Sequence, residues 1–143
     1  MWRKLVLGLT CVMVCGVANA NECLRYNDDV SLQGRLVRET FAEQPNYENI
    51  ANGDAKATYF FIAPATPLCV EPGKIDIGDI GESHVKIVQL VFVSKEDLFG
   101  PLKPFIGREV HCSGKVIHAI SGHHHSRILL TTSNCGFSEN HKN

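Results

Sequence analysis

The sequence of 143 residues lacks the features that mark several large classes of protein. It has no basic excess, because 14 lysines and arginines stand against 15 aspartates and glutamates, whereas nucleic-acid binders depend on positive charge to neutralise phosphates. It contains neither the Gly-x-Ser-x-Gly motif of many hydrolases nor the His-Glu-x-x-His motif of zinc proteases. No internal repeat or low-complexity tract is present. We therefore expect no nucleic-acid partner, and no motif identifies a catalytic residue.

The apolar run that opens the chain has the layout of a secretory signal peptide. Arg3 and Lys4 provide a charged start. Leu5–Val17 is apolar but too short to span a bilayer stably, and Ala18–Ala20 supplies small residues at a cleavage site. We expect residues 1–20 to be removed on export.

The mature chain, residues 21–143, has the size of one domain. Loss of Arg3 and Lys4 leaves 12 lysines and arginines against 15 acidic residues, a formal charge of −3. None of its apolar runs has the length of a transmembrane helix. We expect a single domain, periplasmic or secreted, with no membrane span in the mature chain.

Four cysteines remain after removal of the signal peptide: Cys23, Cys69, Cys112 and Cys135. None of them has the close spacing that is typical of zinc sites, so two disulfides are the simplest interpretation in an oxidising compartment. Four cysteines allow three connectivities. In a hairpin that turns at Gly122–His125, Cys112 and Cys135 each lie ten residues from the turn and therefore face each other. This registry favours Cys112 with Cys135, which leaves Cys23 with Cys69.

Alternating and β-branched residues predict five strands separated by turn formers. A short helical segment is expected at 94–107, between the third and fourth strands, because its two prolines prevent a long helix. This order is typical of the OB-fold, so we predict an all-β fold with small helical content, a five-stranded OB-like barrel. A different small barrel or a two-sheet sandwich could use the same strands. The predicted strands are Val30–Phe41, Thr58–Ala63, Val85–Val93, Arg108–Ile120 and Arg127–Thr132.

Two local patterns refine this prediction. Leu32, Gly34 and Leu36 should share one face of the first strand, with Gly34 at a bend or bulge. Leu68–Val70 should continue the second strand after a break, and residues 71–83 should be an irregular connection.

Two polar loops fall on one face of an OB-like barrel. Residues 42–56 join the first two strands, and residues 121–127, Ser-Gly-His-His-His-Ser-Arg, join the last two. Loops in these positions flank the surface where OB-folds usually bind ligands. We expect the second loop to be a solvent-side hairpin tip that faces the first loop and shapes a binding surface. The candidate partner-binding residues are Asn46, Tyr47, Asp54, His123, His124 and His125.

A metal site is the alternative interpretation of the histidine run. Neutral imidazoles bind zinc and copper. Successive side chains of an extended chain point in opposite directions, so only His123 and His125 could share a face. His118 or an acidic residue of the facing loop would then complete the set. The preferred interpretation is a polar hairpin tip without a cofactor, because no close cysteine pair accompanies the histidines.

Short motifs cover nearly all of residues 30–130: Leu32-x-Gly34-x-Leu36, Glu39–Phe41, Pro45–Glu48, Gly53-Asp54, Pro67-x-Cys69, Val88–Leu90, Gly107-x-x-Val110, Gly122–His125 and Leu129-Leu130. As a set they resemble a family of small exported bacterial proteins known only as a domain of unknown function, with a C-terminal Gly-His-His-His motif. The resemblance implies a single exported domain. It implies no reaction, substrate or catalytic residue.

Together these observations favour a non-enzymatic, disulfide-stabilised binding module. Its partner would be an envelope or extracellular protein, peptide or glycan, gripped by the two loops as in an inhibitor or an immunity-type protein. A metal-binding protein that uses His123 and His125 is one alternative. An enzyme is another, because an acid/base pair that is distant in the chain can meet in space.

The exported protein should begin at Asn21, because Ala18–Ala20 is the cleavage site that the signal pattern predicts. Mass spectrometry of the protein recovered from the periplasm or medium measures this directly. Full-length chain in the cytoplasm, or a lipid on Cys15, would contradict the predicted compartment.

Overall fold

The computed structural model of the protein describes residues 22–74, 78–93 and 99–137. The predicted signal peptide, residues 1–20, and the start of the predicted helical segment, residues 94–98, lie outside these ranges.

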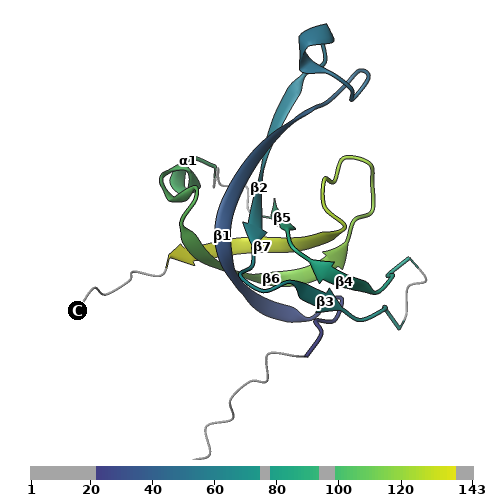
Figure 1. The fold of residues 1–143 in the computed structure, drawn as a ribbon, viewed down its shortest axis with the longest axis vertical. Helices are drawn as coiled ribbons and strands as arrows, with labels where there is room; N and C mark the ends of the chain where they lie inside the picture. Colours follow the sequence, from purple (N-terminus) through teal and green to yellow (C-terminus); the bar gives the residue numbers. More distant parts are fainter. Residues whose placement is uncertain (1–21, 75–77, 94–98, 138–143) are drawn as a thin grey trace, which may run out of the picture.

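The described residues form a mostly β structure, which confirms the all-β prediction. Five strands make a closed barrel in the order β1-β2-β5-β7-β6, and β6 returns to β1 (Figure 1). Neighbouring strands are antiparallel except β5 and β7, which are parallel. The barrel strands are β1 (Asp29–Ala42), β2 (Lys56–Ala63), β5 (Val88–Phe92), β6 (Glu109–His118) and β7 (Ile128–Phe137).

The barrel core follows from the alternation of apolar residues along each strand, since successive side chains point to opposite faces. On β1, Leu32, Gly34 and Leu36 are buried while the residues between them are exposed, which confirms the predicted inner face. Val88 and Leu90 of β5 enter the same core.

A short helical segment connects β5 to β6 along the chain. It consists of α1 (Phe99–Leu102) and the 3-10 turn η2 (Lys103–Phe105). Pro101 and Pro104 lack the backbone N–H that a longer helix would need. Leu102 is buried in the barrel core. No helix in the described ranges has the length and apolar character to cross a membrane.

The connection between β2 and β5 differs from the prediction. Leu68–Val70 does not continue β2 but forms a separate strand, β3, which pairs with β4 (Glu82–Val85) in a second, two-stranded sheet. The predicted irregular connection at 71–83 therefore ends inside a strand, and the predicted strand Val85–Val93 is divided. Pro64 and Pro67 explain the break after β2, because neither can donate a ladder hydrogen bond.

Both predicted disulfides are present, which confirms their connectivity. Cys23 and Cys69 are bonded with their Cα atoms 4.7 Å apart, and Cys112 and Cys135 are bonded with theirs 4.1 Å apart. The first bond ties the start of the chain to β3, where the Leu24 N–H also donates to the carbonyl oxygen of Cys69 at 2.8 Å.

The registry used to predict the second disulfide holds at the cysteines but not at the turn. Cys112 pairs with Cys135, yet His118 pairs with Ile128, because a bulge next to Gly114 adds one residue to β7. Strand pairing ends at His118 and Ile128, so the hairpin does not turn tightly at Gly122–His125. It opens into a longer loop at residues 119–127, closed by a hydrogen bond from the Ala119 N–H to the Arg127 carbonyl at 2.8 Å. We call residues 119–127 the histidine loop.

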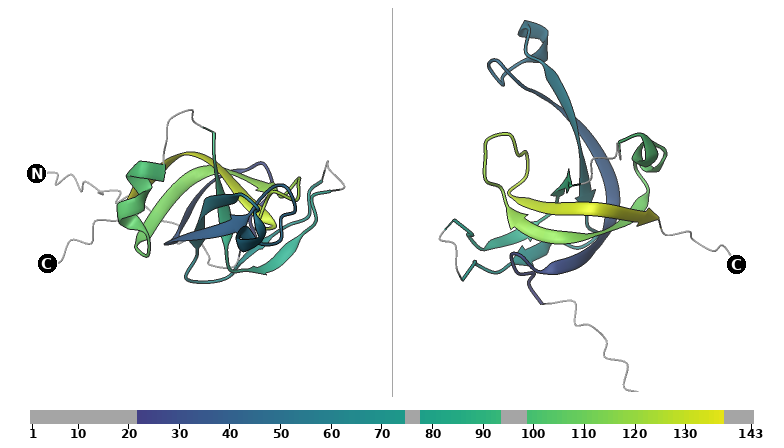
Figure 2. Two further views of the ribbon diagram at one scale, coloured as in Figure 1. Left: turned by 90° about the horizontal axis from the view of Figure 1, so that it is seen from above. Right: turned by 180° about the vertical axis from the view of Figure 1, so that it is seen from behind.

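β1 changes its partner half-way along its length. From Asp29 to Arg35 it pairs with β6, and from Arg35 to Ala42 it pairs with β2. The second half continues with β2 beyond the barrel as a two-stranded ribbon (Figure 1, Figure 2). We call this ribbon, residues 39–59, the arm, and its connection, residues 43–55, the arm loop. Figure 1 shows the arm and the histidine loop rising from the same side of the barrel.

Gly34 lies next to the residue at which β1 changes partner. A Cβ atom at this position would come within 2.5 Å of the Ala63 carbonyl oxygen and 2.7 Å of the Ile62 Cγ2 atom. The expected bulge is not seen, because both ladders of β1 run without a register shift. Gly34 instead allows the end of β2 to approach β1 closely.

Gly34→Ala should therefore destabilise the fold by about 1–3 kcal/mol, the usual cost of overpacking a tight contact. Urea unfolding of the oxidised protein measures this free energy. The matched control is Gly122→Ala, where a Cβ atom meets nothing within 4 Å and a change within about 0.5 kcal/mol is expected. Equal stability of the two variants would show that the close approach of β2 to β1 does not require glycine at position 34.

Candidate functional site

A row of buried side chains lies on the outer face of the barrel. Phe61, Gln89 and Leu129 are each at most 2 % exposed, although the strand neighbours of each point into the core. Phe61 pairs with Gln89, and Gln89 pairs with Leu129, so the three cross β2, β5 and β7 side by side. A row on this face is buried only if another segment covers it.

The histidine loop supplies much of this cover. The His125 backbone N–H donates to Gln89 Oε1 at 2.7 Å, and the Ser126 hydroxyl donates to the Ile87 carbonyl at 3.0 Å. Both bonds join the loop to β5 or to the residue before it. A buried amide is costly unless it is hydrogen-bonded. Gln89 therefore favours the position of the histidine loop in which the His125 N–H donates to its Oε1 atom.

The His125 ring packs against the strands of the arm, close to the arm loop. It stacks on Phe41, with ring centroids 3.7 Å apart and an interplanar angle of 3°, and its centroid lies 5.0 Å from that of Tyr59. Phe41 in turn contacts Phe61 edge-to-face at 6.1 Å. His125 thereby links the histidine loop, the arm and the outer row in one aromatic cluster.

The prediction of a solvent-side hairpin tip is therefore wrong for His125, whose side chain is only 17 % exposed. The reason is the stack on Phe41 and the buried row beneath, neither of which local sequence reveals. His124 is half-buried, and burial lowers the pKa of its imidazole, with the neighbouring His123 and His125 acting in the same direction. His123 fits the prediction, with a side chain that is 56 % exposed.

Glu43 lies between the two loops and faces His123 and His125, the first and last residues of the histidine run. Its Oε1 accepts a hydrogen bond of 2.7 Å from the Tyr59 hydroxyl and lies 3.6 Å from His125 Nε2. Its Oε2 lies 3.7 Å from His123 Nδ1. The Glu43 side chain is 16 % exposed, so the carboxylate is largely enclosed by these three rings.

The surroundings of Glu43 favour its charged form. The hydrogen bond from Tyr59 lowers the pKa of Glu43 below its usual value, against the opposing effect of burial, and His125 and His123 lower it further. Burial, followed by the nearby carboxylate, raises the pKa of Tyr59 to about 12. At neutral pH the pair therefore consists of a carboxylate and a neutral phenol. Such a carboxylate can hold a cationic group or exchange a proton with an imidazole.

Asp54 holds the arm loop together from within. It is 5 % exposed, and its carboxylate accepts hydrogen bonds from the backbone N–H groups of Asn46, Glu48 and Asn49 and from Asn46 Nδ2, at 2.9–3.1 Å. The N–H groups of Asn49, Glu48 and Asn46, in that order, lower the pKa of Asp54 against the effect of burial. Asn49 then caps the short 3-10 turn η1 (Ile50–Asn52). The polar residues of this loop are thus largely used to shape it.

Tyr47 is the residue of the arm loop that reaches the histidine loop. Its ring meets the His123 ring edge-to-face at 5.4 Å, and it is 41 % exposed. Tyr47 has a φ of 60°, a left-handed conformation that costs energy for a residue with a side chain. The hydrogen bonds around Asp54 hold the backbone in this region and so present the ring.

The structure brings together some of the candidate residues and separates others. Tyr47, His123 and His125 meet around Glu43, while Asp54 and Asn46 bond mainly to each other and to the arm-loop backbone. His118 lies apart, 3.8 Å from Glu82 and edge-to-face with Tyr26. The metal alternative calls for an acidic residue of the facing loop near the histidines without specifying it, and Glu43 takes this position. No sequence pattern indicates the roles of Phe41 and Gln89.

The two histidines share a single carboxylate. Within residues 22–74, 78–93 and 99–137, no group of three or more histidine, cysteine, aspartate or glutamate side chains is arranged to hold a metal ion. His118, which could have completed a zinc or copper site with His123 and His125, contacts other residues.

The C-terminal part of this site matches a family model. Residues 87–134 match the model of the family described as a domain of unknown function (DUF4431). The predicted resemblance to a domain of unknown function is thereby confirmed. The DUF4431 match contains β5, β6 and the histidine loop, whereas Glu43, Tyr47 and Tyr59 lie outside it. No curated protein and no solved structure matches the chain.

His125→Ala should lower the free energy of unfolding by about 1–3 kcal/mol, because it removes a largely buried ring that stacks on Phe41. His123→Ala should change it by no more than about 0.5 kcal/mol, because most of that side chain faces solvent. Urea denaturation of the two variants under oxidising conditions gives both values. If both were neutral, the histidine loop would not contribute to the stability of the domain.

Proposed function

We propose that this protein is an exported binding module that holds an envelope or extracellular partner on the surface shared by the arm loop and the histidine loop. The observation that carries this proposal is that two loops far apart in the chain meet there. Tyr47 contacts His123, and Glu43 faces both His123 and His125. Exposed aromatic and imidazole rings above a fixed carboxylate suit the recognition of a protein, peptide or glycan. Tyrosine in particular is enriched at interfaces.

Among these partner classes a protein is favoured. The arm loop carries two exposed apolar side chains, Tyr47 and Ile50, each 41 % exposed. Both stand on a loop whose backbone is fixed by the buried Asp54. A rigid loop with exposed apolar side chains loses little conformational freedom on binding. Small disulfide-stabilised inhibitors and immunity-type proteins use projecting loops in this way.

The fold assignment that belongs to this proposal is an OB-like barrel at residues 21–143. Its support is the strand order β1-β2-β5-β7-β6, the parallel pairing of β5 with β7, and the short helix α1 between the third and fourth barrel strands. In an OB-fold the loops after the first and fourth strands flank the ligand-binding face. The arm loop and the histidine loop hold these positions.

Export, to the periplasm or beyond the cell, is likewise a proposal. It is supported by the signal-like residues 1–20 and by the two disulfides, since such bonds persist in oxidising compartments.

An acid–base enzyme is a second candidate, favoured by the imidazole of His125 next to the carboxylate of Glu43. His125 Nε2 is buried and has no hydrogen-bond partner within the described residues. The binding function is preferred because Glu43 and His125 are both largely covered, by each other and by Tyr59. A substrate would have to displace this packing to reach them.

The partner should bind through Tyr47 and His123. We would capture it from envelope extract and culture medium with the mature protein, purify it, and measure its affinity by calorimetry for wild type, Tyr47→Ala and His123→Ala. Each substitution should weaken binding by about tenfold or more, the loss of 1–2 kcal/mol that is typical of a central interface residue.

Val93→Ala is the matched control, because Val93 is 63 % exposed and follows β5. Its affinity should equal that of wild type. Undiminished affinity of both loop variants would exclude this surface, and turnover of the captured molecule would favour the enzyme instead.

A further inference from the structure

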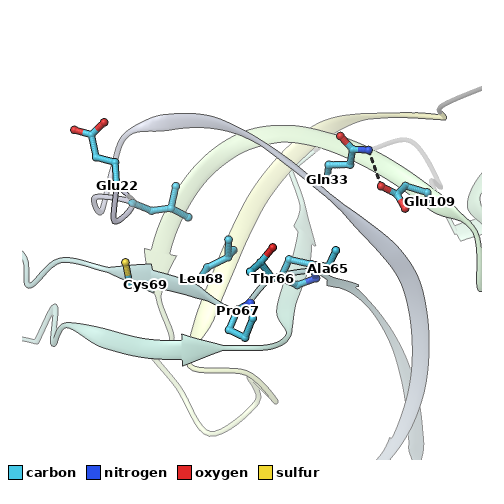
Figure 3. Close-up of a pocket in the computed structure, with 10 residues that line it drawn as sticks. Glu22, Gln33, Ala65, Thr66, Pro67, Leu68, Cys69 and Glu109 are labelled. Carbon is cyan, nitrogen blue, oxygen red and sulfur yellow. Dashed lines mark hydrogen bonds between the residues drawn. The ribbon is translucent and has the colours of Figure 1, made fainter. Parts of the chain in front are cut away.

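A cavity of about 510 Å³ lies on a different part of the molecule from the loop surface (Figure 3). It is bounded on one side by Gln33 of β1 and on the other by residues 64–69, with Glu22, Leu24 and Glu109 at its margins. None of these residues belongs to the cluster around Glu43.

The β1 wall of this cavity is an open strand edge. The Leu36 N–H donates to the Arg108 carbonyl, and the Gly107 N–H donates to the Leu36 carbonyl, both at 2.8 Å. The backbone N–H and C=O groups of Leu36 therefore point toward β6. By the alternation of an antiparallel ladder, those of Gly34 and Leu32 do the same. The residues in between, Ser31 and Gln33, direct theirs to the opposite side.

On that opposite side β2 does not reach as far as the cavity. Its pairing with β1 begins at Arg35, opposite Ala63, and continues away from Gln33. Within the described ranges, no strand pairs with this side of β1 before Arg35. Such an edge can accept a further strand.

The far wall makes no strand pairing with Gln33 within the described residues, and it is poor in hydrogen-bond donors. It contains Pro64 and Pro67, which have no backbone N–H. Beyond them, β3 is already paired with β4 on one side, and on the other the carbonyl of Cys69 accepts from Leu24. The cavity is therefore a slot between one unpaired edge and a wall that does not pair with it in the described structure.

The slot is acidic. Glu22 lies at one end and Glu109 at the other (Figure 3), and none of its lining residues is lysine, arginine or histidine. Gln33 Nε2 donates to Glu109 Oε1 at 2.6 Å, which fixes one of the two carboxylates next to the open edge (Figure 3).

We propose that this slot binds an extended peptide segment of another protein by strand addition to β1, with separate basic side chains of the peptide facing Glu22 at one end and Glu109 at the other. The backbone groups of Ser31 and Gln33 pair with the peptide, as in other complexes in which a peptide extends a sheet. The acidic margin selects lysine or arginine over acidic residues. This site is independent of the function proposed for the loop surface.

Fluorescence anisotropy with the mature, oxidised protein tests the proposal. The probe is a fluorescein-labelled peptide of alternating valine and lysine. The first control peptide has the same sequence with every second amide N-methylated, which prevents strand pairing. The second control has glutamate in place of lysine. The probe should bind, the N-methylated peptide should bind on the order of tenfold more weakly or not at all, and the glutamate peptide should not bind.

Two variants of one residue separate backbone pairing from side-chain contact. Gln33→Pro removes the edge N–H without touching the ladder to β6, and should weaken probe binding by about tenfold. Gln33→Ala keeps the N–H and should weaken it far less. If Gln33→Pro fails to fold by circular dichroism, Ser31→Pro and Ser31→Ala provide the same comparison. Glu22→Gln with Glu109→Gln should reduce the affinity and its dependence on salt.

Equal binding of the N-methylated peptide, or no binding of the probe by wild type, would overturn the proposal. A concentration-dependent dimer in sedimentation would also overturn the proposal if Gln33→Pro abolished the dimer and the probe did not compete with its formation. A second copy of the chain would then occupy the edge of β1. Tyr47→Ala and His123→Ala should bind the probe like wild type, which keeps this test separate from that of the loop surface.

Discussion

The division of β1 between two partners is the constraint on which the rest of the structure depends. Its first half closes the barrel with β6, and its second half leaves the barrel with β2. Gly34, at the change, allows the end of β2 to come close. The projecting arm, the contact of the arm loop with the histidine loop, and the open edge before Arg35 all follow from this one change of partner.

The loop surface rests on a polar residue in an apolar place. Gln89 occupies the middle of a buried row on the outside of the barrel, where its amide must be hydrogen-bonded. The backbone N–H of His125 provides the hydrogen bond to its Oε1 atom. The same position lets the His125 ring stack on Phe41 and face Glu43. The hydrogen bond to Gln89 thus couples the position of the histidine loop to the strands of the arm.

Much of the fold could be predicted because it depends on local pattern. The inner face of β1 follows from the spacing of Leu32, Gly34 and Leu36, and the disulfide pairing follows from hairpin symmetry. That symmetry holds at Cys112 and Cys135 but not at the turn, because a bulge next to Gly114 shifts the register by one residue and strand pairing ends at His118 and Ile128. β3 and β4 are three and four residues long, with a register irregularity between them. Strands this short carry too little periodicity to be recognised.

The candidate site could be predicted only in part, because its contacts join distant segments. The histidine run and Tyr47 stand out in the sequence as unusual polar or aromatic residues in loops. The stack of His125 on Phe41 and the choice of Glu43 depend on how the arm curves, which no local pattern encodes.

The two disulfides close loops that do not overlap along the chain: one spans residues 23–69 and the other residues 112–135. For a polypeptide that enters an oxidising compartment N-terminus first, the first cysteine pair is complete before either member of the second pair has emerged. Among the four cysteines of residues 21–143, joining neighbours in the order of their arrival therefore yields the connectivity seen in the structure.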